Sequence, residues 1–193
     1  MKHPFRVCPV RPGSLVVYPL LLMALVAAPA QASNRLSDST AGRRVMVDYI
    51  VHFAHHLQWP IAAFTGTDAP FRICVMGGAE LFEPLTERLD RHRVGGRRVE
   101  LLRVEEGETT RARSCQILVF GAMERANLLK TMGALEFFPV LTVSDADRFA
   151  VTGGMVEFAG SGANVALQLN KTMLERAELK IGDSLFRLSR KLR

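Results

Sequence analysis

The first clearly periodic segment of the chain is helical. From Arg43 onward, apolar residues recur three or four positions apart in two adjacent rows, Val45, Tyr49, Phe53 and Met46, Ile50, Ala54, Leu57. This spacing places them on one broad face of an α-helix. Trp59 and Pro60 close the segment, and proline cannot continue a helix. The pattern therefore predicts an amphipathic helix that ends before Pro60.

Short apolar segments then alternate with helical ones. Runs of this length between turn residues are typical of buried strands, and we expect strands at residues 71–76, 99–104, 117–120 and 140–143. Helical spacing of apolar residues predicts helices over 81–89 and 123–135. A third, short helix is expected to begin at a cap formed by Ser144 and Asp145 and to end at Phe149 and Ala150.

The last third of the chain has a different pattern. Residues 155–159 and 165–169 alternate around a glycine-rich turn, which predicts a β-hairpin, and two short helices separated near Gly182 should follow. Strands separated by helices imply parallel pairing, with crossovers that place helices on both faces. The predicted fold is α/β: a three-layer, doubly wound, mostly parallel sheet with a C-terminal β-hairpin at one edge.

The N-terminus has the organisation of a Sec-type signal peptide. Lys2, Arg6 and Arg11 precede an apolar run over residues 15–28 that is too short to span a bilayer as a helix. Ala30 and Ala32 supply the small residues of a cleavage site, so we expect residues 1–32 to be removed and a single domain to span 33–193. The alternative is an uncleaved membrane anchor. Cleavage predicts a protein exported to the periplasm.

Removal of this leader changes the charge and the cysteine count. The formal net charge of +6 at pH 7 falls to about +3, because three basic residues and no acidic ones are lost. The remaining basic residues lack the interleaved aromatic residues of a single-strand binder, so nucleic acid is not expected as a partner. Only Cys74 and Cys115 remain. If the four predicted strands are numbered along the chain, a doubly wound sheet has the order 2-1-3-4, and the first and third strands, which hold or adjoin these cysteines, are neighbours. We expect one disulfide between them; two buried free thiols are the alternative.

Candidate chemical sites are few. His52, His55 and His56 share a helix face, but no third and fourth ligand accompany them, so solvated histidines are favoured over a metal site. Gly77 and Gly78 lack a complete phosphate-binding motif, and Ser144 and Asp145 lack the partners of a catalytic nucleophile. The sequence therefore predicts neither an enzyme nor a bound metal or cofactor.

The order of several segments resembles the YfiR family of periplasmic regulators. The segments are Phe53-Ala54, Trp59-Pro60, 71–77, 115–118, 140–145, 153–155, Asn164, Leu169-Asn170 and 179–181. The resemblance implies a repressor that binds the periplasmic part of an inner-membrane diguanylate cyclase and so lowers cyclic di-GMP and biofilm formation. It also implies an outer-membrane OmpA-like lipoprotein that sequesters the repressor, a homodimer and a disulfide. Some members carry a second cysteine pair, which this chain lacks.

Two functions follow as expectations. For a repressor, the partner contact is expected at Tyr49, Phe53, Leu57 and Trp59, which offer more apolar surface than one short helix needs to bury, although core packing accounts for some of them. The alternative is a periplasmic small-ligand-binding protein. Its site would lie at the carboxyl ends of the strands, at Gly77, Gly78, Gly121, Ser144 and Asp145.

Overall fold

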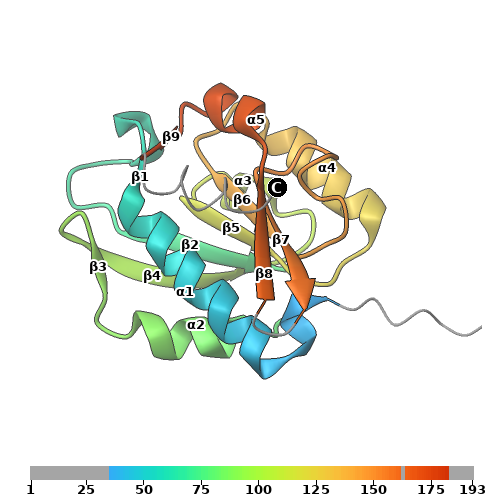
Figure 1. The fold of residues 1–193 in the computed structure, drawn as a ribbon. Coiled ribbons are helices and arrows are strands. Elements are labelled where there is room, and N and C mark those ends of the chain that lie inside the picture. The colour runs from blue at the N-terminus through green and yellow to red at the C-terminus, as the bar shows by residue number, and fades with distance from the viewer. Residues whose placement is uncertain (1–34, 162–163, 183–193) are drawn as a thin grey trace, which may run out of the picture. The chain divides into compact units, whose positions relative to one another are not determined.

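The computed structural model describes residues 35–161 and 164–182, and these form an α/β fold (Figure 1). The helices are η1 (Leu36–Asp38), α1 (Thr40–His56), η2 (Ile61–Ala63), α2 (Phe82–Leu89), α3 (Thr109–Ala112), α4 (Arg125–Leu135) and α5 (Lys171–Arg176). The strands are β1 (Leu57–Gln58), β2 (Phe71–Met76), β3 (Arg93–Val94), β4 (Arg97–Val104), β5 (Ile117–Phe120), β6 (Leu141–Ser144), β7 (Val156–Ser161), β8 (Asn164–Leu169) and β9 (Lys180–Ile181).

One seven-stranded sheet organises the fold, in the order β3-β4-β2-β5-β6-β7-β8. The five central strands are parallel, whereas β3 and β8 pair antiparallel at the two edges. The order β4-β2-β5-β6 is the predicted 2-1-3-4 arrangement, and β7 and β8 form the predicted hairpin at one edge. The predicted fold class is confirmed.

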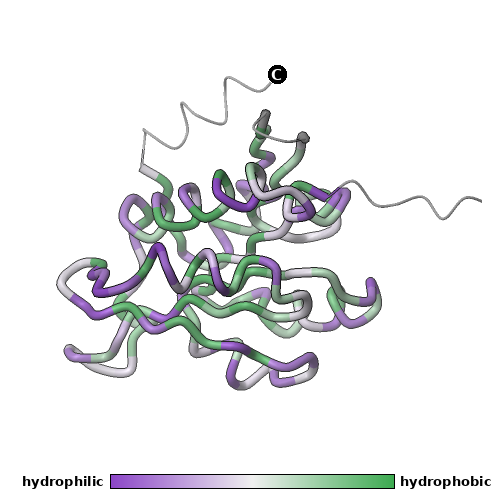
Figure 2. The backbone as a smooth tube through the Cα atoms, turned by 90° about the horizontal axis from the view of Figure 1, so that it is seen from below, coloured by the Kyte–Doolittle hydropathy of each residue, from purple (hydrophilic) through white to green (hydrophobic). Residues whose placement is uncertain are grey.

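Two apolar clusters lie on opposite faces of this sheet. The first packs α1 and α2 against strand residues such as Ile73 and Val119, and the second packs α3 and α4 against their alternate neighbours, such as Cys74 and Leu118. This division follows from the alternation of side chains along each strand. In Figure 2 the apolar segments run through the middle of the fold and the hydrophilic segments lie toward its outside.

The N-terminal helix begins and ends where the sequence provides signals. The Ser39 hydroxyl accepts a hydrogen bond from the Gly42 amide at 3.0 Å, which caps the first turn of α1. The helix buries Met46, Ile50 and Phe53 and ends at His56, four residues before Pro60. Its apolar rows thus cover the sheet as the periodicity predicts.

The predicted short helix after Ser144 is wrong. Ser144 belongs to β6, and residues 147–153 form turns. Arg148 has a positive φ of 57°, which a right-handed helix does not accommodate, and the ring of Phe149 is fully buried beneath the sheet. The anchored ring and the reversed backbone at Arg148 favour turns over a helix.

Three short strands were not predicted from the sequence. β3 forms a small hairpin with β4, and β1 pairs with β9 in a separate two-stranded sheet. α5 matches the first predicted C-terminal helix, whereas the second one, the predicted leader and its cleavage site lie outside the described residues. Within residues 35–161 and 164–182, no helix has the length and hydropathy needed to cross a bilayer.

Candidate functional site

The carboxyl ends of β2 and β5 are joined by direct backbone contact. The Gly78 amide donates to the Ala122 carbonyl at 2.9 Å, and the Gly121 amide donates to the Met76 carbonyl at 2.8 Å. A Cβ atom at Gly121 would stand 2.3 Å from the Gly78 carbonyl oxygen. These glycines permit two loops to touch at the position where doubly wound folds usually bind a ligand.

The next strand end is occupied by the N-terminal segment. Asp145, which is buried, accepts hydrogen bonds from Nε of Arg35 at 2.9 Å and from the Ser37 amide at 2.7 Å. The Ser144 hydroxyl is fully buried and donates to the Phe120 carbonyl at 3.0 Å. Asp145 therefore anchors η1 instead of capping a helix, which corrects the predicted role of both residues.

The five residues of the alternative ligand site thus lie at one end of the sheet, but the protein fills most of the space between them. Beside Gly77, between the ends of β2 and β4, is a cavity of about 180 Å³ lined in part by Val75, Arg103 and Glu105. Ligand pockets usually measure about 300–1,000 Å³. The carboxyl ends of the strands therefore offer little room for a small ligand.

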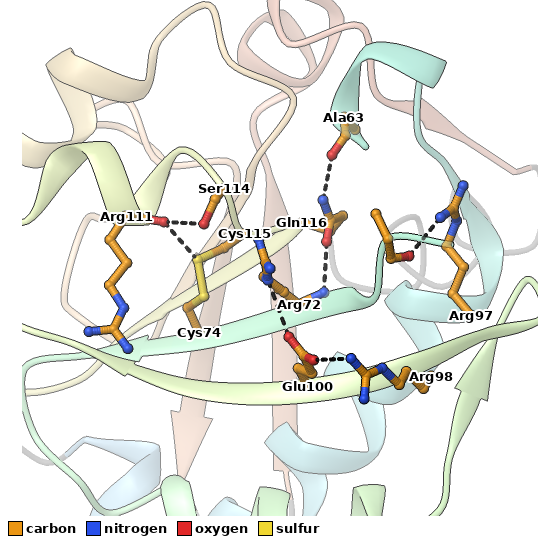
Figure 3. Close-up of polar contacts among 11 residues, drawn as sticks. Ala63, Arg72, Cys74, Arg97, Arg98, Glu100, Arg111, Ser114, Cys115 and Gln116 are labelled. Carbon is orange, nitrogen blue, oxygen red and sulfur yellow. Dashed lines mark hydrogen bonds and ion pairs between the residues drawn. A yellow bond between two sulfur atoms is a disulfide. The ribbon is translucent and has the colours of Figure 1, made fainter. Parts of the chain in front are cut away.

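The predicted disulfide between Cys74 and Cys115 is present. It joins β2 to the residue two positions before β5, across a Cα–Cα distance of 6.0 Å (Figure 3). Both cysteines are buried in the cluster that packs α3 and α4 against the sheet. The bridge therefore fixes two neighbouring parallel strands near the start of β5.

A buried glutamine beside the disulfide organises the opposite end of the sheet from Asp145. Gln116 is 3% exposed, and its Oε1 accepts from the Arg72 amide at 2.7 Å while its Nε2 donates to the Ala63 carbonyl at 2.6 Å (Figure 3). Its backbone carbonyl accepts from the Trp59 indole at 3.2 Å. Sequence reasoning missed this residue, and only its place directly before a fully apolar strand could have drawn attention to it.

The four aromatic and apolar residues predicted for partner contact are mostly part of the core. Phe53 is 1% exposed and Leu57 is 8% exposed, so neither offers a contact surface. Tyr49 and Trp59 are half-buried: the Tyr49 ring lies 5.9 Å from that of Phe158, and the Trp59 ring lies edge-on to Phe71 at 4.9 Å. Core packing therefore accounts for more of this set than expected.

Two exposed apolar side chains lie close together elsewhere on the surface. Leu129 of α4 and Val151 of the turns after β6 are 42% and 68% exposed, and both line a groove of about 420 Å³ that also includes Met132 and Met173. The groove is also lined by the ion pair of Arg176 with Glu136, so it combines apolar and charged groups, as the surfaces that contact other proteins do. Nothing in the sequence pattern distinguished these residues from ordinary core positions.

The three histidines of α1 take part in two ring pairs, one within the helix and one with His92. The rings of His52 and His56 lie 4.1 Å apart, and Nε2 of His55 lies 2.8 Å from Nε2 of His92, which follows α2. His55 and His56 are exposed, whereas Nε2 of His52 is buried without a hydrogen-bond partner among the described residues. Burial, followed by the neighbouring His56 and His55, lowers the pKa of His52. The pairing of His55 with His92 was missed because the two lie 37 residues apart.

Comparison with known sequences adds the family. No curated protein matches this chain. A family model described as YfiR/HmsC-like matches residues 43–190, which is most of the chain and includes all but the first three residues of α1, the seven-stranded sheet and the disulfide. The chain therefore belongs to the YfiR/HmsC-like family.

Proposed function

We propose that the protein is a non-enzymatic periplasmic regulator that binds the periplasmic sensor part of an inner-membrane diguanylate cyclase and holds it inactive. Repression would lower cyclic di-GMP and biofilm formation. The observation that carries this proposal is the match of residues 43–190 to the YfiR/HmsC-like family. The signal-peptide pattern of residues 1–32 supports export to the compartment where such a contact can form.

Because the strand ends are closed, they favour a protein that binds another macromolecule over the alternative, a protein that binds a small ligand. The contact between Gly78 and Ala122 and the anchoring of Arg35 and Ser37 on Asp145 use the customary ligand position for internal packing. The exposed groove that Leu129 and Val151 line is better suited to contact with another protein than to enclosing a small ligand. We take this groove as the first face to test for the cyclase contact.

The proposal extends to two further partners. An outer-membrane OmpA-like lipoprotein would sequester the regulator when the envelope is stressed, and the regulator itself would act as a homodimer. Sequestration releases repression because the same copies cannot occupy the lipoprotein and the cyclase. Both partners rest on the family resemblance, and cross-linking in intact cells would identify them.

Deletion of the gene in the source organism tests the function directly. Cyclic di-GMP and surface adhesion should rise, and a plasmid copy with its own leader should restore the low level. A copy beginning at residue 33 provides the matched control, since it should accumulate in the cytoplasm without restoring repression. An unchanged cyclic di-GMP level after deletion would rule out the repressor function and favour a small-ligand-binding protein.

A further inference from the structure

We propose that Arg93 and Arg98 form a binding site for a phosphate group, carried by an anionic phospholipid headgroup or by free inorganic phosphate. The two arginines lie directly opposite each other on β3 and β4, on either side of the turn formed by Gly95 and Gly96. Directly opposite residues of an antiparallel pair project from the same face of the sheet. Both guanidinium groups therefore leave the same side of this edge hairpin.

The hydrogen bonds of the hairpin bring the two side chains close together. The Val99 amide donates to the His92 carbonyl at 3.2 Å, so these two residues form a hydrogen-bonded pair of the ladder. Hydrogen-bonded and non-hydrogen-bonded pairs alternate along antiparallel strands, so the next pair, Arg93 and Arg98, is non-hydrogen-bonded. The Cα atoms of such a pair stand about 4.5 Å apart, and its side chains are the closer ones. Both guanidinium groups can thus reach one phosphate group.

This pairing of two cations is unfavourable unless an anion lies between them. Like charges directly opposite each other destabilise a sheet, and residues 91–99 contain four arginines and no carboxylate. The carboxylate of the following residue, Glu100, is shared between Arg98 at 3.0 Å and Arg72 at 3.3 Å (Figure 3). Protection of the sheet edge does not require a second arginine, because β3 is only two residues long. A bound anion would remove the repulsion.

A pocket of about 330 Å³ lies beside the arginine pair, within the usual size range of ligand sites. Arg97 supports its wall, because its Nη1 donates at 3.0 Å and 2.6 Å to two carbonyls of the segment 66–69. This segment places Thr67 and Asp68 in the wall of the pocket. Asp68 is the one carboxylate among the lining residues, against three arginines, so the pocket has a net positive charge.

Both arginines of the pair keep N–H donors available. Nη1 of Arg93 donates to the Gly96 carbonyl at 2.8 Å, and Nη2 of Arg98 lies 3.0 Å from the Glu100 carboxylate. Most of their remaining donors have no partner among the described residues, and the Arg98 side chain is 71% exposed. A guanidinium group can donate two parallel hydrogen bonds to phosphate oxygens. A phosphate group has enough oxygens to accept from both arginines at once.

Titration of the isotope-labelled protein with inorganic phosphate, followed by nuclear magnetic resonance, tests the site. The amide signals of Gly95 and Gly96 should shift, because both glycines line the pocket. Arg93→Gln and Arg98→Gln should each weaken binding by about fivefold, as expected for the loss of one exposed ion pair. Asp68→Asn should strengthen binding, since it removes a negative charge from the wall, and a misfolded variant would not give that result.

Sedimentation with vesicles distinguishes the two sources of the phosphate group. Binding to vesicles of phosphatidylglycerol and phosphatidylcholine, but not to phosphatidylcholine alone, would identify an anionic phospholipid as the ligand. That binding should be lost in about 0.5 M NaCl and weakened about fivefold by Arg93→Gln. Shifts with inorganic phosphate but no vesicle binding would identify free phosphate. The site goes beyond the proposed function, and neither experiment involves the cyclase.

Arg111→Gln is the matched control, because it removes one charge from a side chain that is 50% exposed on α3 and does not line the pocket. The proposal fails if neither probe binds, or if this control weakens binding as much as Arg93→Gln. Tighter binding of a polyglutamate peptide than of either probe would assign the pair to an acidic protein segment instead. The melting temperature of Arg93→Gln should not fall, since the substitution relieves repulsion. A fall would mean that the pair stabilises the fold.

Discussion

Arg35 and Asp145 lie 110 residues apart in the chain and form an ion pair that fastens the N-terminal segment to the end of β6. The Asp145 side chain is 1% exposed and that of Arg35 is 14% exposed. The carboxylate also accepts from the Ser37 amide, so one side chain holds both ends of a short segment. The result is a covered strand end, at the place where related architectures leave an open crevice.

Asp145→Asn should therefore destabilise the fold. It leaves a largely buried guanidinium without its counter-charge, and we expect a loss of about 2–3 kcal/mol in the free energy of unfolding. Urea unfolding followed by circular dichroism measures it. Asp48→Asn is the matched control, because the exposed Arg88–Asp48 pair should contribute less than about 1 kcal/mol. Equal losses in the two variants would contradict the structural role of Asp145.

The Cys74–Cys115 disulfide should contribute about 4 kcal/mol through loop closure, since it joins residues 41 apart in the chain. Replacing both cysteines by alanine should lower stability by this amount, and unfolding the unaltered protein in reductant should give the same value. Labelling of the unfolded, unreduced protein should detect no free thiol. A melting temperature that does not change on reduction would exclude a stabilising bridge.

Two glycines should respond to alanine in opposite directions. Gly121→Ala places a Cβ atom 2.3 Å from the Gly78 carbonyl and should cost about 1–3 kcal/mol. Gly133 lies within α4 with open space around it, so Gly133→Ala should stabilise the protein by about 0.5–1 kcal/mol. Thermal denaturation of both variants checks the sign. Stabilisation by Gly121→Ala would mean that the two loops do not touch as described.

Stability should fall as the pH drops below about 6.5, the ordinary pKa of histidine. The pKa of His52 is lowered in the folded state, chiefly by burial. The unfolded chain therefore takes up this proton first, and the stabilising contribution of neutral His52 is complete above pH 6.5 and lost toward the lower folded pKa. Melting temperatures from pH 7.5 to 5 should show this decrease. His52→Gln should make it shallower; an unchanged slope would assign the decrease to other groups.

Substitutions in the groove should locate the partner contact. Val151→Glu and Leu129→Glu introduce charge at positions that are already exposed, so repression should be lost while the melting temperature is kept. Ile61→Glu is the control, because Ile61 is 93% exposed and does not line this groove. Cyclic di-GMP measurements in the deletion strain decide the outcome. Full repression by both groove variants would move the contact to another face.

The sheet could be predicted because its strands are short, apolar and bounded by glycine. Segments 71–76 and 117–120 are apolar over almost their whole length, as strands buried on both faces require, and their order follows from right-handed crossovers. The disulfide followed from that order. Strands of two residues, such as β1 and β9, are too short to leave a periodic signal.

The site could not be predicted in the same way, because it depends on contacts between distant residues. Asp145 had the local appearance of a helix cap, yet its partner is Arg35 near the other end of the domain. Phe53 had the appearance of a surface anchor, yet Phe158 of the hairpin covers it, with the two ring centroids 6.2 Å apart. Periodicity identifies an apolar face but does not say which element will meet it.

The packing of α1 against the C-terminal hairpin has a consequence for how the chain acquires its structure. Tyr49 and Phe53 contact Phe158, so α1 meets this neighbour only after more than 100 further residues have left the ribosome or an export channel. During that interval α2 and β2 can already cover part of the apolar side of the helix, but the part that faces Phe158 has no cover. The segment between Cys74 and Cys115 emerges earlier, so oxidation can join β2 to the start of β5 while the hairpin is still being delivered.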